Sequence, residues 1–368
     1  MGIRARIDLA ALRGNFAVLR RAAPGSHAFA VVKADAYGHG ALRVAKSLSG
    51  VADGFAVARL GEAMELRDGG IEQPILLLEG VSGDDELVVA LAAGLDLVVH
   101  EPGQIAMFRR LAAGGAHHPP PIVWLKADTG MNRLGFRPEA VLEARSQLLA
   151  CGVALQDLRL MTHLARADEP GVDTTKAQLA RLTSIVTAWQ HQAGSRPVVS
   201  IGNSAGALLW SAGKGDWIRP GIALYGVAPS AERGSAESGL TPVMTLSTEV
   251  IALREVPRGE TVGYGGAWQA ARDSKIAILA AGYADGLPRH LPSGAPVAFR
   301  TGRAPLAGRV SMDMIAVDVT DLPAVAVGER AVLWGEGLPV EEVAGWAGTI
   351  AYELLCAVAP RVPREYVG

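Results

Sequence analysis

The chain has 368 residues, of which 49% are apolar, enough for two or three domains with large cores. Its 35 basic and 37 acidic residues give a net charge of −2 and form no long blocks, so neither nucleic acid nor an anionic membrane is expected as a partner. This balance favours a small neutral or zwitterionic substrate.

The amino-terminal stretch MGIRARIDLAALRGNF carries a charge every few residues, unlike a secretory signal, and no other stretch approaches a membrane span. Cys151 and Cys356 are the only two thiols, which suits a reducing compartment and argues against a disulfide framework. We therefore expect a cytoplasmic protein that needs no membrane.

Short apolar runs alternate with helical patterns through the first part of the chain. Eight such runs are recognised, at 28–33, 54–57, 75–78, 96–99, 122–126, 158–162, 198–200 and 217–219. This spacing implies parallel strands joined by crossover helices, and eight units in roughly 200 residues match a closed (β/α)8 barrel. An open doubly wound sheet is the competing architecture. We predict an α/β fold with a TIM-like barrel over 8–228.

The sequence pattern changes after the barrel, from alternating strands and helices to a polar segment followed by strand-like runs. Residues 229–240 are small and polar and predict a linker, and 241–368 predict a mainly β domain that residues 1–7 could join. The strand-like runs there are 243–256, 276–281, 297–300, 314–319 and 331–334, with a short helix near 341–346.

The run AVVKADAYGHG, at 30–40, presents a lysine at the end of an apolar strand and before a glycine-rich turn. A partly desolvated lysine at such a place has a lowered pKa and can form a Schiff base with a carbonyl or with pyridoxal phosphate. Lys33 is therefore a candidate catalytic residue, although a lone strand-end lysine is usually only a solvated surface group. His39, in the turn that follows, is expected to shape that turn.

Other polar residues follow the remaining strands, at the end of a barrel where such folds carry their chemistry. They are Lys126, Asp128, Arg133, His163, Asn203, Ser204 and Arg219. Backbone N–H groups after the seventh and eighth strands often bind phosphate, and Ser204, Gly221 and Ile222 are spaced for that role. One barrel mouth could hold all of these residues.

Nine motifs now resemble bacterial alanine racemases, which are pyridoxal phosphate enzymes with a barrel and a β domain, and the likeness runs nearly end to end. In order, they are AVVKADAYGHG, LKADTGMNRLG, THLARADE, GNSAGAL, IRPGIALYG, VGYGG, GYADG, GRVSMDM and RVPR. The resemblance implies interconversion of L-alanine and D-alanine by two-base transfer of the α-proton on a pyridoxal 5′-phosphate aldimine. It makes Lys33 one base and Tyr264, in VGYGG, the other, on the opposite face of the α-carbon.

In this family the tyrosine belongs to the partner subunit, so the resemblance implies a head-to-tail homodimer with composite sites. It places His163 near Tyr264 and Arg219, and puts Arg219 at the pyridine nitrogen. Because a guanidinium keeps its proton, the ring nitrogen would stay unprotonated, which disfavours transamination.

The same likeness implies further contacts. Tyr37, Ser204, Gly221 and Ile222 would hold the phosphate. Arg133 and the backbone at Met312 would orient the ring oxygen and the substrate carboxylate, and Asp313 could shape the pocket or the turn. Lys126 occupies the position of a lysine that can be carbamylated and so hold Arg133. No metal is implied.

Two positions depart from the family pattern as read from the sequence. Pro360 stands where many relatives have a tyrosine near the phosphate, which predicts a lost ring hydroxyl. Ser200 stands where some have a histidine that supports the arginine, and its hydroxyl could still form a hydrogen bond.

Taken singly, these residues also have ordinary structural interpretations. Tyr264 could cap a sheet, His163 could be a core residue, Arg219 could form a salt bridge and Ser204 could begin a helix. His117 and His118 precede three prolines, and we expect no metal there. Cys356, in AYELLCAVA, is expected to be buried and inert.

Three other functions compete with alanine racemisation. A related decarboxylase would carry an acidic residue at the pyridine nitrogen, and a non-catalytic cofactor carrier would lack the β domain. A broad-specificity racemase, for example one acting on serine, would use the same residues in a different pocket. Supply of D-alanine for peptidoglycan is the expected role, with D-alanine catabolism as the open alternative.

Overall fold

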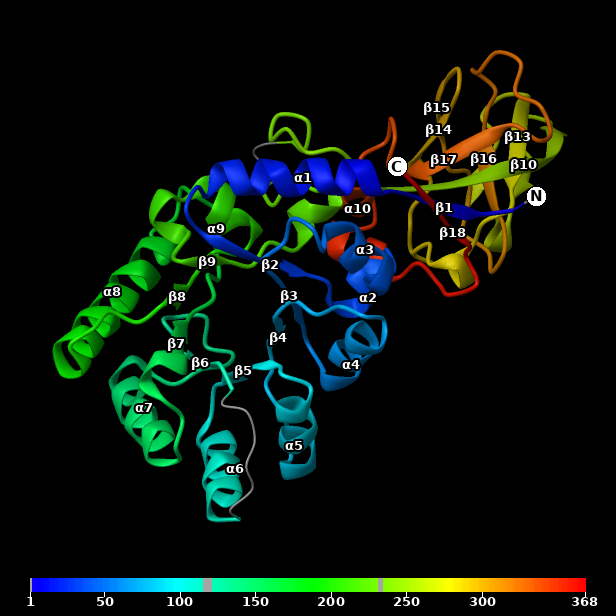
Figure 1. Ribbon diagram of the computed structural model, residues 1–368. Helices are drawn as coiled ribbons and strands as arrows, with labels where there is room; N and C mark the ends of the chain where they lie inside the picture. Colours follow the sequence, from blue (N-terminus) through cyan, green and yellow to red (C-terminus); the bar gives the residue numbers. More distant parts are fainter. Residues whose placement is uncertain (1, 115–120, 231–233) are drawn as a thin grey trace.

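A closed barrel of eight parallel strands forms the larger lobe of the molecule, and a β-rich lobe lies beside it (Figure 1). The structure is a computed structural model that describes residues 2–114, 121–230 and 234–368. His117 and His118 lie outside the described residues. Within the described ranges, no helix is both long and apolar enough to cross a membrane.

From β2 to β8 each barrel strand pairs in parallel with the next, and the last strand, β9, pairs in parallel with the first. In order, the strands are β2 (His27–Val31), β3 (Gly54–Val57), β4 (Ile75–Leu77), β5 (Asp96–Val99), β6 (Val123–Lys126), β7 (Leu158–Met161), β8 (Val199–Ser200) and β9 (Trp217–Ile218). Backbone bonds close the ring between β8 and β9, where the Asp216 N–H donates to the Val199 carbonyl at 2.8 Å. The predicted (β/α)8 barrel is thereby confirmed.

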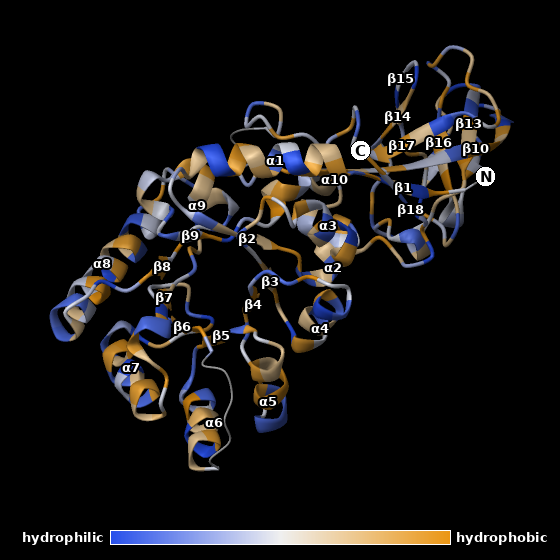
Figure 2. Ribbon diagram, viewed as in Figure 1, coloured by the Kyte–Doolittle hydropathy of each residue, from blue (hydrophilic) through white to orange (hydrophobic). Residues whose placement is uncertain are grey.

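Helices cover the outside of the barrel, as all-parallel sheets require because both faces of their strands are buried. They are α1 (Leu9–Ala22), α3 (Ala41–Leu48), α4 (Leu60–Asp68), α5 (Asp84–Ala92), α6 (Pro102–Ala113), α7 (Val141–Ala150), α8 (Thr174–Ala193) and α9 (Ser204–Leu209). Each mixes hydrophilic and hydrophobic residues, as in Figure 2. In α3 the buried residues are Ala41, Val44, Ala45 and Leu48, the i, i+3, i+4, i+7 stripe of a helix with one face on a core.

The second lobe is built on a long strand, β10 (Met244–Val256), which bends at a register shift and serves two groups of strands. The main path is β15 (Gly302–Pro305), β14 (Pro296–Phe299), β17 (Arg330–Trp334), β10, β1 (Arg4–Asp8) and β18 (Arg364–Val367). The other group is β13 (Ser274–Leu279) and β16 (Ile315–Asp318); β11 (Thr261–Val262) and β12 (Trp268–Gln269) form a separate hairpin. The lobe is mainly β, as predicted, and takes its β1 from the amino terminus.

Two short helices complete this lobe, α10 (Val340–Trp346) and α11 (Ala351–Cys356). α11 lies back against the segment that follows β2, so a piece of the second lobe borders the barrel mouth (Figure 1). The predicted limits of 8–228, 229–240 and 241–368 stay predictions, since residues 231–233 of the linker lie outside the described ranges.

A buried asparagine ties the two lobes together. The Asn15 side chain, on α1, donates to the carbonyls of Leu224 and Thr241 at 3.1 and 2.8 Å and accepts from the Thr241 N–H at 2.8 Å. It thus holds the end of the barrel domain and the start of the β domain on one helix.

Candidate active site

A cavity of about 480 Å³ opens at the carboxyl ends of the barrel strands. Ten of the candidate site residues that the sequence singled out line it: Lys33, Tyr37, Lys126, Arg133, His163, Asn203, Ser204, Arg219, Gly221 and Ile222. The cavity therefore joins candidate residues that end or follow five different barrel strands, as expected when parallel strands all end at one rim.

Lys33 begins α2 (Lys33–Gly38), a short turn of unusual hand. Ala34, Asp35, Ala36 and Tyr37 have φ between 51° and 55°, the left-handed region. For residues with a Cβ this conformation costs about 1–2 kcal/mol each, so the surroundings must impose it. The Ala34 N–H donates to Glu62 Oε1 at 2.7 Å, and the carboxylate of Asp35 accepts from the Ala41 N–H at 2.8 Å.

Arg219 is 4% exposed, and its guanidinium is held by oxygens and one ring nitrogen. It donates to Ser200 Oγ, to the Thr162 carbonyl at 2.7 Å and to His163 Nδ1 at 3.3 Å. Ser200 gives its own proton to the Trp217 carbonyl at 2.9 Å, so it can only accept from the arginine. The expected hydrogen bond between Ser200 and Arg219 is confirmed. Burial lowers the pKa of Arg219 to about 10, so it stays charged near neutrality.

His163 is a neutral imidazole in this setting. Burial, then the charges of Arg219 and Lys126, lower its pKa well below the usual value. Since a guanidinium can only donate, His163 Nδ1 accepts from Arg219 and the ring proton resides on Nε2. The pair therefore offers an N–H donor next to a buried cation.

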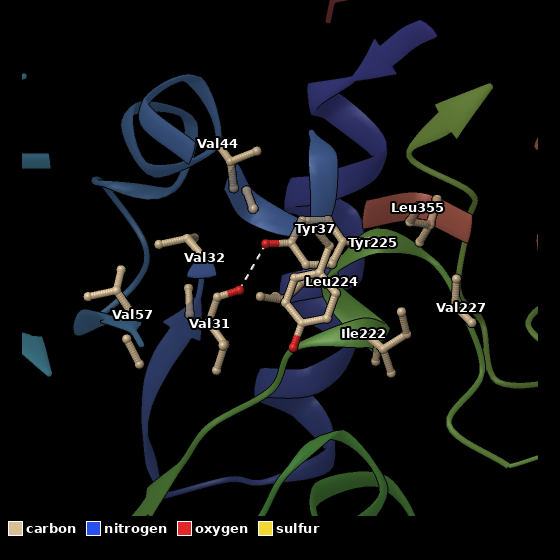
Figure 3. Packing of buried hydrophobic residues seen from close by; sticks show 14 of the residues in the cluster. Val31, Val32, Tyr37, Val44, Val57, Ile222, Leu224, Tyr225, Val227 and Leu355 are labelled. Carbon is tan, nitrogen blue, oxygen red and sulfur yellow. Dashed lines mark hydrogen bonds between the residues drawn. The ribbon is translucent and has the colours of Figure 1, made fainter. Parts of the chain in front are cut away.

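Ser204, Gly221 and Tyr37 form a small polar cradle. Ser204 Oγ accepts from the N–H groups of Gly221 and Ala223 at 3.0 and 3.2 Å. A Cβ on Gly221 would lie 2.4 Å from the Tyr37 hydroxyl, so only glycine leaves room for that oxygen. Figure 3 shows the Tyr37 ring beside Tyr225, close to Ile222. Hydroxyl and backbone N–H groups together suit a phosphate.

Lys126 is 9% exposed, and its pKa falls to about 8 because of burial and then the positive charges of Arg219, Arg133 and Lys33, with Glu79 opposing the shift. Arg133, on the following loop, makes no hydrogen bond or ion pair with any described residue. Two cationic groups thus border the cavity, and neither Lys126 nor Arg133 forms an ion pair with any described residue.

The charge of the cavity wall points to its ligand. Lys33, Lys126, Arg133 and Arg219 contribute four cationic side chains against one carboxylate, that of Glu79. Because this excess faces a partly enclosed space, an anionic ligand is favoured there.

Tyr264 and Met312 are not part of the cavity in one chain. Tyr264 begins a turn after β11 and is 68% exposed, and Met312, in the loop before β16, is 54% exposed. The Met312 loop is nevertheless ordered by hydrogen bonds: the Ala284 N–H donates to the Met312 carbonyl at 3.0 Å, and Arg361 bridges Asp285 and Asp313, at 2.7 Å to each.

Two expectations from the sequence are wrong. Pro360 is exposed and does not line the cavity, whereas Tyr352 does, so a tyrosine is present near the cradle after all. Cys356 is also exposed, and its thiol lines the cavity instead of being buried in a core. Tyr352 and Cys356 lie four residues apart on one face of α11, but the sequence does not show that this face meets the barrel mouth.

Comparisons with known proteins agree with this architecture. The family model "Alanine racemase, N-terminal domain" matches residues 7–229, and "Alanine racemase, C-terminal domain" matches residues 243–366. An alanine racemase from Chromohalobacter salexigens is 49% identical over 98% of this chain and 97% of its own length.

Solved structures are equally similar. The biosynthetic alanine racemase of Pseudomonas aeruginosa superposes with a TM-score of 0.93 at 47% identity, covering 100% of this chain and 99% of that one. The alanine racemase of Bartonella henselae, solved with covalently bound pyridoxal phosphate, has a TM-score of 0.89 at 28% identity and covers all of both chains.

Proposed function

Because the chain belongs to the alanine racemase family, we propose that its cavity binds pyridoxal 5′-phosphate on Lys33 and moves the α-proton of alanine between Lys33 and Tyr264 of the partner subunit. The reaction class follows from membership: the chain is a racemase, an isomerase that interconverts L-alanine and D-alanine. A serine racemase is not favoured.

One observation carries the proposal: a single cavity holds a lysine, a buried arginine with its histidine, and a cradle of hydroxyl and backbone N–H groups. These are the parts that the cofactor needs. An aldehyde requires an amine at Lys33, a phosphate requires the N–H groups and hydroxyls around Ser204, Gly221 and Tyr37, and a pyridine nitrogen accepts from a guanidinium that cannot give up its proton, that of Arg219.

The missing side chain at Gly221 is the sharpest test of this fit. A Cβ there would displace the Tyr37 hydroxyl, and that hydroxyl has no hydrogen-bond partner among the described residues. The cradle thus keeps a free donor for an incoming anion. When bound, the cofactor supplies an electron sink for the pair of electrons left when the α-proton departs.

The chain's own residues do the rest. Lys33 acts as base on one face of the α-carbon, and the partner subunit's Tyr264 acts on the other. Neutral His163 offers its Nε2–H toward that phenol oxygen and, with Arg219, stabilises the phenolate. Arg133 and the backbone at Met312 orient the substrate carboxylate.

Lys126 is proposed to be carbamylated. Its neutral amine attacks carbon dioxide, a nitrogen–carbon bond forms, and one proton is released to solvent, which leaves a carbamate anion. The lowered pKa, about 8, makes that neutral amine available near physiological pH. The carbamate would lie between Lys126 and Arg133, in a cavity wall where four cationic side chains face the single carboxylate of Glu79.

The working unit is proposed to be a homodimer. Tyr264 and Met312 are exposed in one chain together with Tyr283, Met314 and Ile350, all on the β domain or next to it. Exposed aromatic and methionine side chains of this kind favour a covered surface. A head-to-tail partner would bring them to the neighbouring barrel mouth.

The product is proposed to supply D-alanine to peptidoglycan in the cytoplasm. Similarity to the biosynthetic Pseudomonas aeruginosa enzyme supports this role, and two unpaired cysteines support a reducing compartment.

Chiral analysis of products tests the reaction. Purified protein with pyridoxal phosphate should form D-alanine from a mixture of L-alanine, L-serine, L-lysine and L-arginine, and little of the other D-isomers. Several D-products in similar amounts would contradict alanine specificity, and no D-product with cofactor bound would contradict the mechanism.

Mixing two inactive variants tests the composite site. A dimer of one Lys33→Ala chain and one Tyr264→Phe chain has one site with both bases and one with neither. Random pairing of equal amounts should therefore restore roughly a quarter of the wild-type sites. If both bases came from one chain, mixing would restore nothing.

A further inference from the structure

Two parts of the motifs have no role in the proposed function: the Gly38-His39-Gly40 end of the YGHG turn after Lys33, and Arg364, the final arginine of RVPR. They meet at the left-handed segment of α2. Arg364 Nε, from β18, donates to the Gly38 carbonyl at 2.9 Å, and a Cβ on Gly38 would lie 2.3 Å from the Leu355 carbonyl. The end of the turn is therefore clamped by the carboxyl-terminal segment, as its start is by Glu62.

His39 holds the middle of the same turn. Its Nδ1 lies 3.0 Å from the Ala36 carbonyl and 2.9 Å from the Tyr37 carbonyl. Carbonyl oxygens only accept, so Nδ1 carries the hydrogen and shares it between them. These are the last two left-handed residues, and the second bears the hydroxyl that faces the phosphate cradle.

The buried imidazole of His39 has one unfavourable feature, a ring nitrogen that forms no hydrogen bond with a described residue. His39 is completely buried, and with the hydrogen on Nδ1 its Nε2 has no partner among the described residues. A buried polar atom without a hydrogen bond is unfavourable, and an apolar ring would avoid it. The advantage of histidine over an apolar ring at this position is therefore its Nδ1–H group, which donates to the two carbonyls of the turn. Burial also lowers the pKa of His39 to about 4, which keeps the ring neutral.

The ring is wedged in a fixed position. Its centroid lies 4.5 Å from that of the Tyr225 ring. The Tyr225 hydroxyl donates to the carbonyl of Val31, the last residue of β2, at 2.8 Å (Figure 3). Tyr225 also packs 4.8 Å from the Tyr37 ring. His39, Tyr225 and Tyr37 thus form one packed unit between the last residue of the strand and the turn.

We propose that His39 is a positioning residue for the cofactor: its Nδ1–H imposes the left-handed turn that aims the Tyr37 hydroxyl at the phosphate and sets where Lys33 emerges. This rests on the proposed function, since it takes the cradle to be the phosphate site. His39 does not itself touch the cofactor.

Two substitutions separate the N–H group from the ring. In His39→Asn the amide nitrogen stands two bonds from Cβ, as Nδ1 does, whereas in His39→Gln it stands one bond further. We expect His39→Asn to bind pyridoxal phosphate within about threefold of wild type and His39→Gln to bind roughly 10-fold to 100-fold more weakly. Titration of the apo protein, followed by cofactor absorbance, measures this, and kcat at saturating cofactor should change less than the affinity.

A double-mutant cycle with Tyr37→Phe tests whether His39 affects cofactor binding through Tyr37. If His39 acts through Tyr37, then His39→Gln and Tyr37→Phe together should weaken binding hardly more than the worse single change. The proposal would be overturned if the fold losses in cofactor affinity of the two single variants multiplied in the double variant. It would also be overturned if His39→Asn and His39→Gln lost affinity equally. If His39→Gln does not fold, a large loss in His39→Asn overturns it alone. Absence of cofactor binding by the wild-type chain would instead overturn the proposed function.

Discussion

The candidate site has two halves, the barrel mouth and the loops of the β domain, and only the first is buried and ordered by its neighbours within one chain. At the barrel mouth, Arg219 and Lys126 are buried, interact with their neighbours and have lowered pKa values. On the β domain, Tyr264 and Met312 stand 68% and 54% exposed and line no cavity with them.

This difference follows from topology. A closed parallel barrel brings every strand's carboxyl end to one rim, so its loops converge without help. The loops of the β domain have no such focus, and Tyr264 lies on a two-stranded hairpin apart from the main sheet. A preorganised half and an exposed half support the proposal that a second chain completes the site.

Replacing the lysine should have the largest effect. Lys33→Ala removes the cofactor's attachment point and one base, and racemisation should fall by at least roughly 10⁴-fold. Borohydride reduction of the cofactor-loaded protein, followed by peptide mapping, should label the peptide of Lys33 in wild type only. Lys46→Ala, an exposed lysine of α3, is the matched control and should keep full activity. A label retained in Lys33→Ala would refute the assignment.

Removing the exposed phenol should break only one face of the reaction. Tyr264→Phe should slow loss of the α-proton from L-alanine by roughly 10²-fold to 10⁴-fold and slow its loss from D-alanine less. Exchange of the α-hydrogen with deuterated solvent measures each direction, and the cofactor absorbance should persist. Tyr366→Phe, on β18, is the control. Equal slowing from both isomers would count against bases on opposite faces.

The proposed carbamate on Lys126 should have a smaller, pH-dependent effect. Because the pKa of Lys126 is lowered to about 8, the reactive neutral amine is scarce well below pH 8 and predominates above it. Carbamate formation with ¹³C-bicarbonate should therefore increase as pH rises through this value, giving a ¹³C signal that Lys126→Ala lacks. That variant should bind alanine about tenfold more weakly, since Arg133 loses its anchor. The same signal in Lys126→Ala would place the modification elsewhere.

Replacing Asn15, which connects the barrel domain to the β domain, should lower stability and hardly change kcat. Asn15→Leu leaves the carbonyls of Leu224 and Thr241 and the Thr241 N–H without the asparagine, which should cost about 1–3 kcal/mol of stability. The thermal midpoint should fall while kcat of the folded enzyme stays within about twofold. A large loss of kcat at low temperature would show that this connection also sets the geometry of the site.

Much of the barrel and its mouth could be predicted from the sequence. Apolar runs of strand length mark buried strands, and a polar residue at the end of such a run is placed at the rim by the fold itself. Lys33, Lys126, His163 and Arg219 were found in this way, and all four line the cavity. The catalytic roles, the cofactor and the dimer came from resemblance to a family, and the individual roles stay predictions.

Only the tertiary structure decided the features made by segments far apart in the chain. It showed that Tyr352 brings a tyrosine to the cavity although position 360 is a proline, and that Cys356 is exposed there, because which face of α11 meets the barrel depends on how the two lobes dock. It also revealed the left-handed turn from Ala34 to Tyr37, which no local preference favours. The sequence by itself determined the strands and the residues at their ends, since burial and periodicity are local properties. Only the tertiary structure brings Glu62 and Arg364, from distant parts of the sequence, to the two ends of the turn that His39 is proposed to hold.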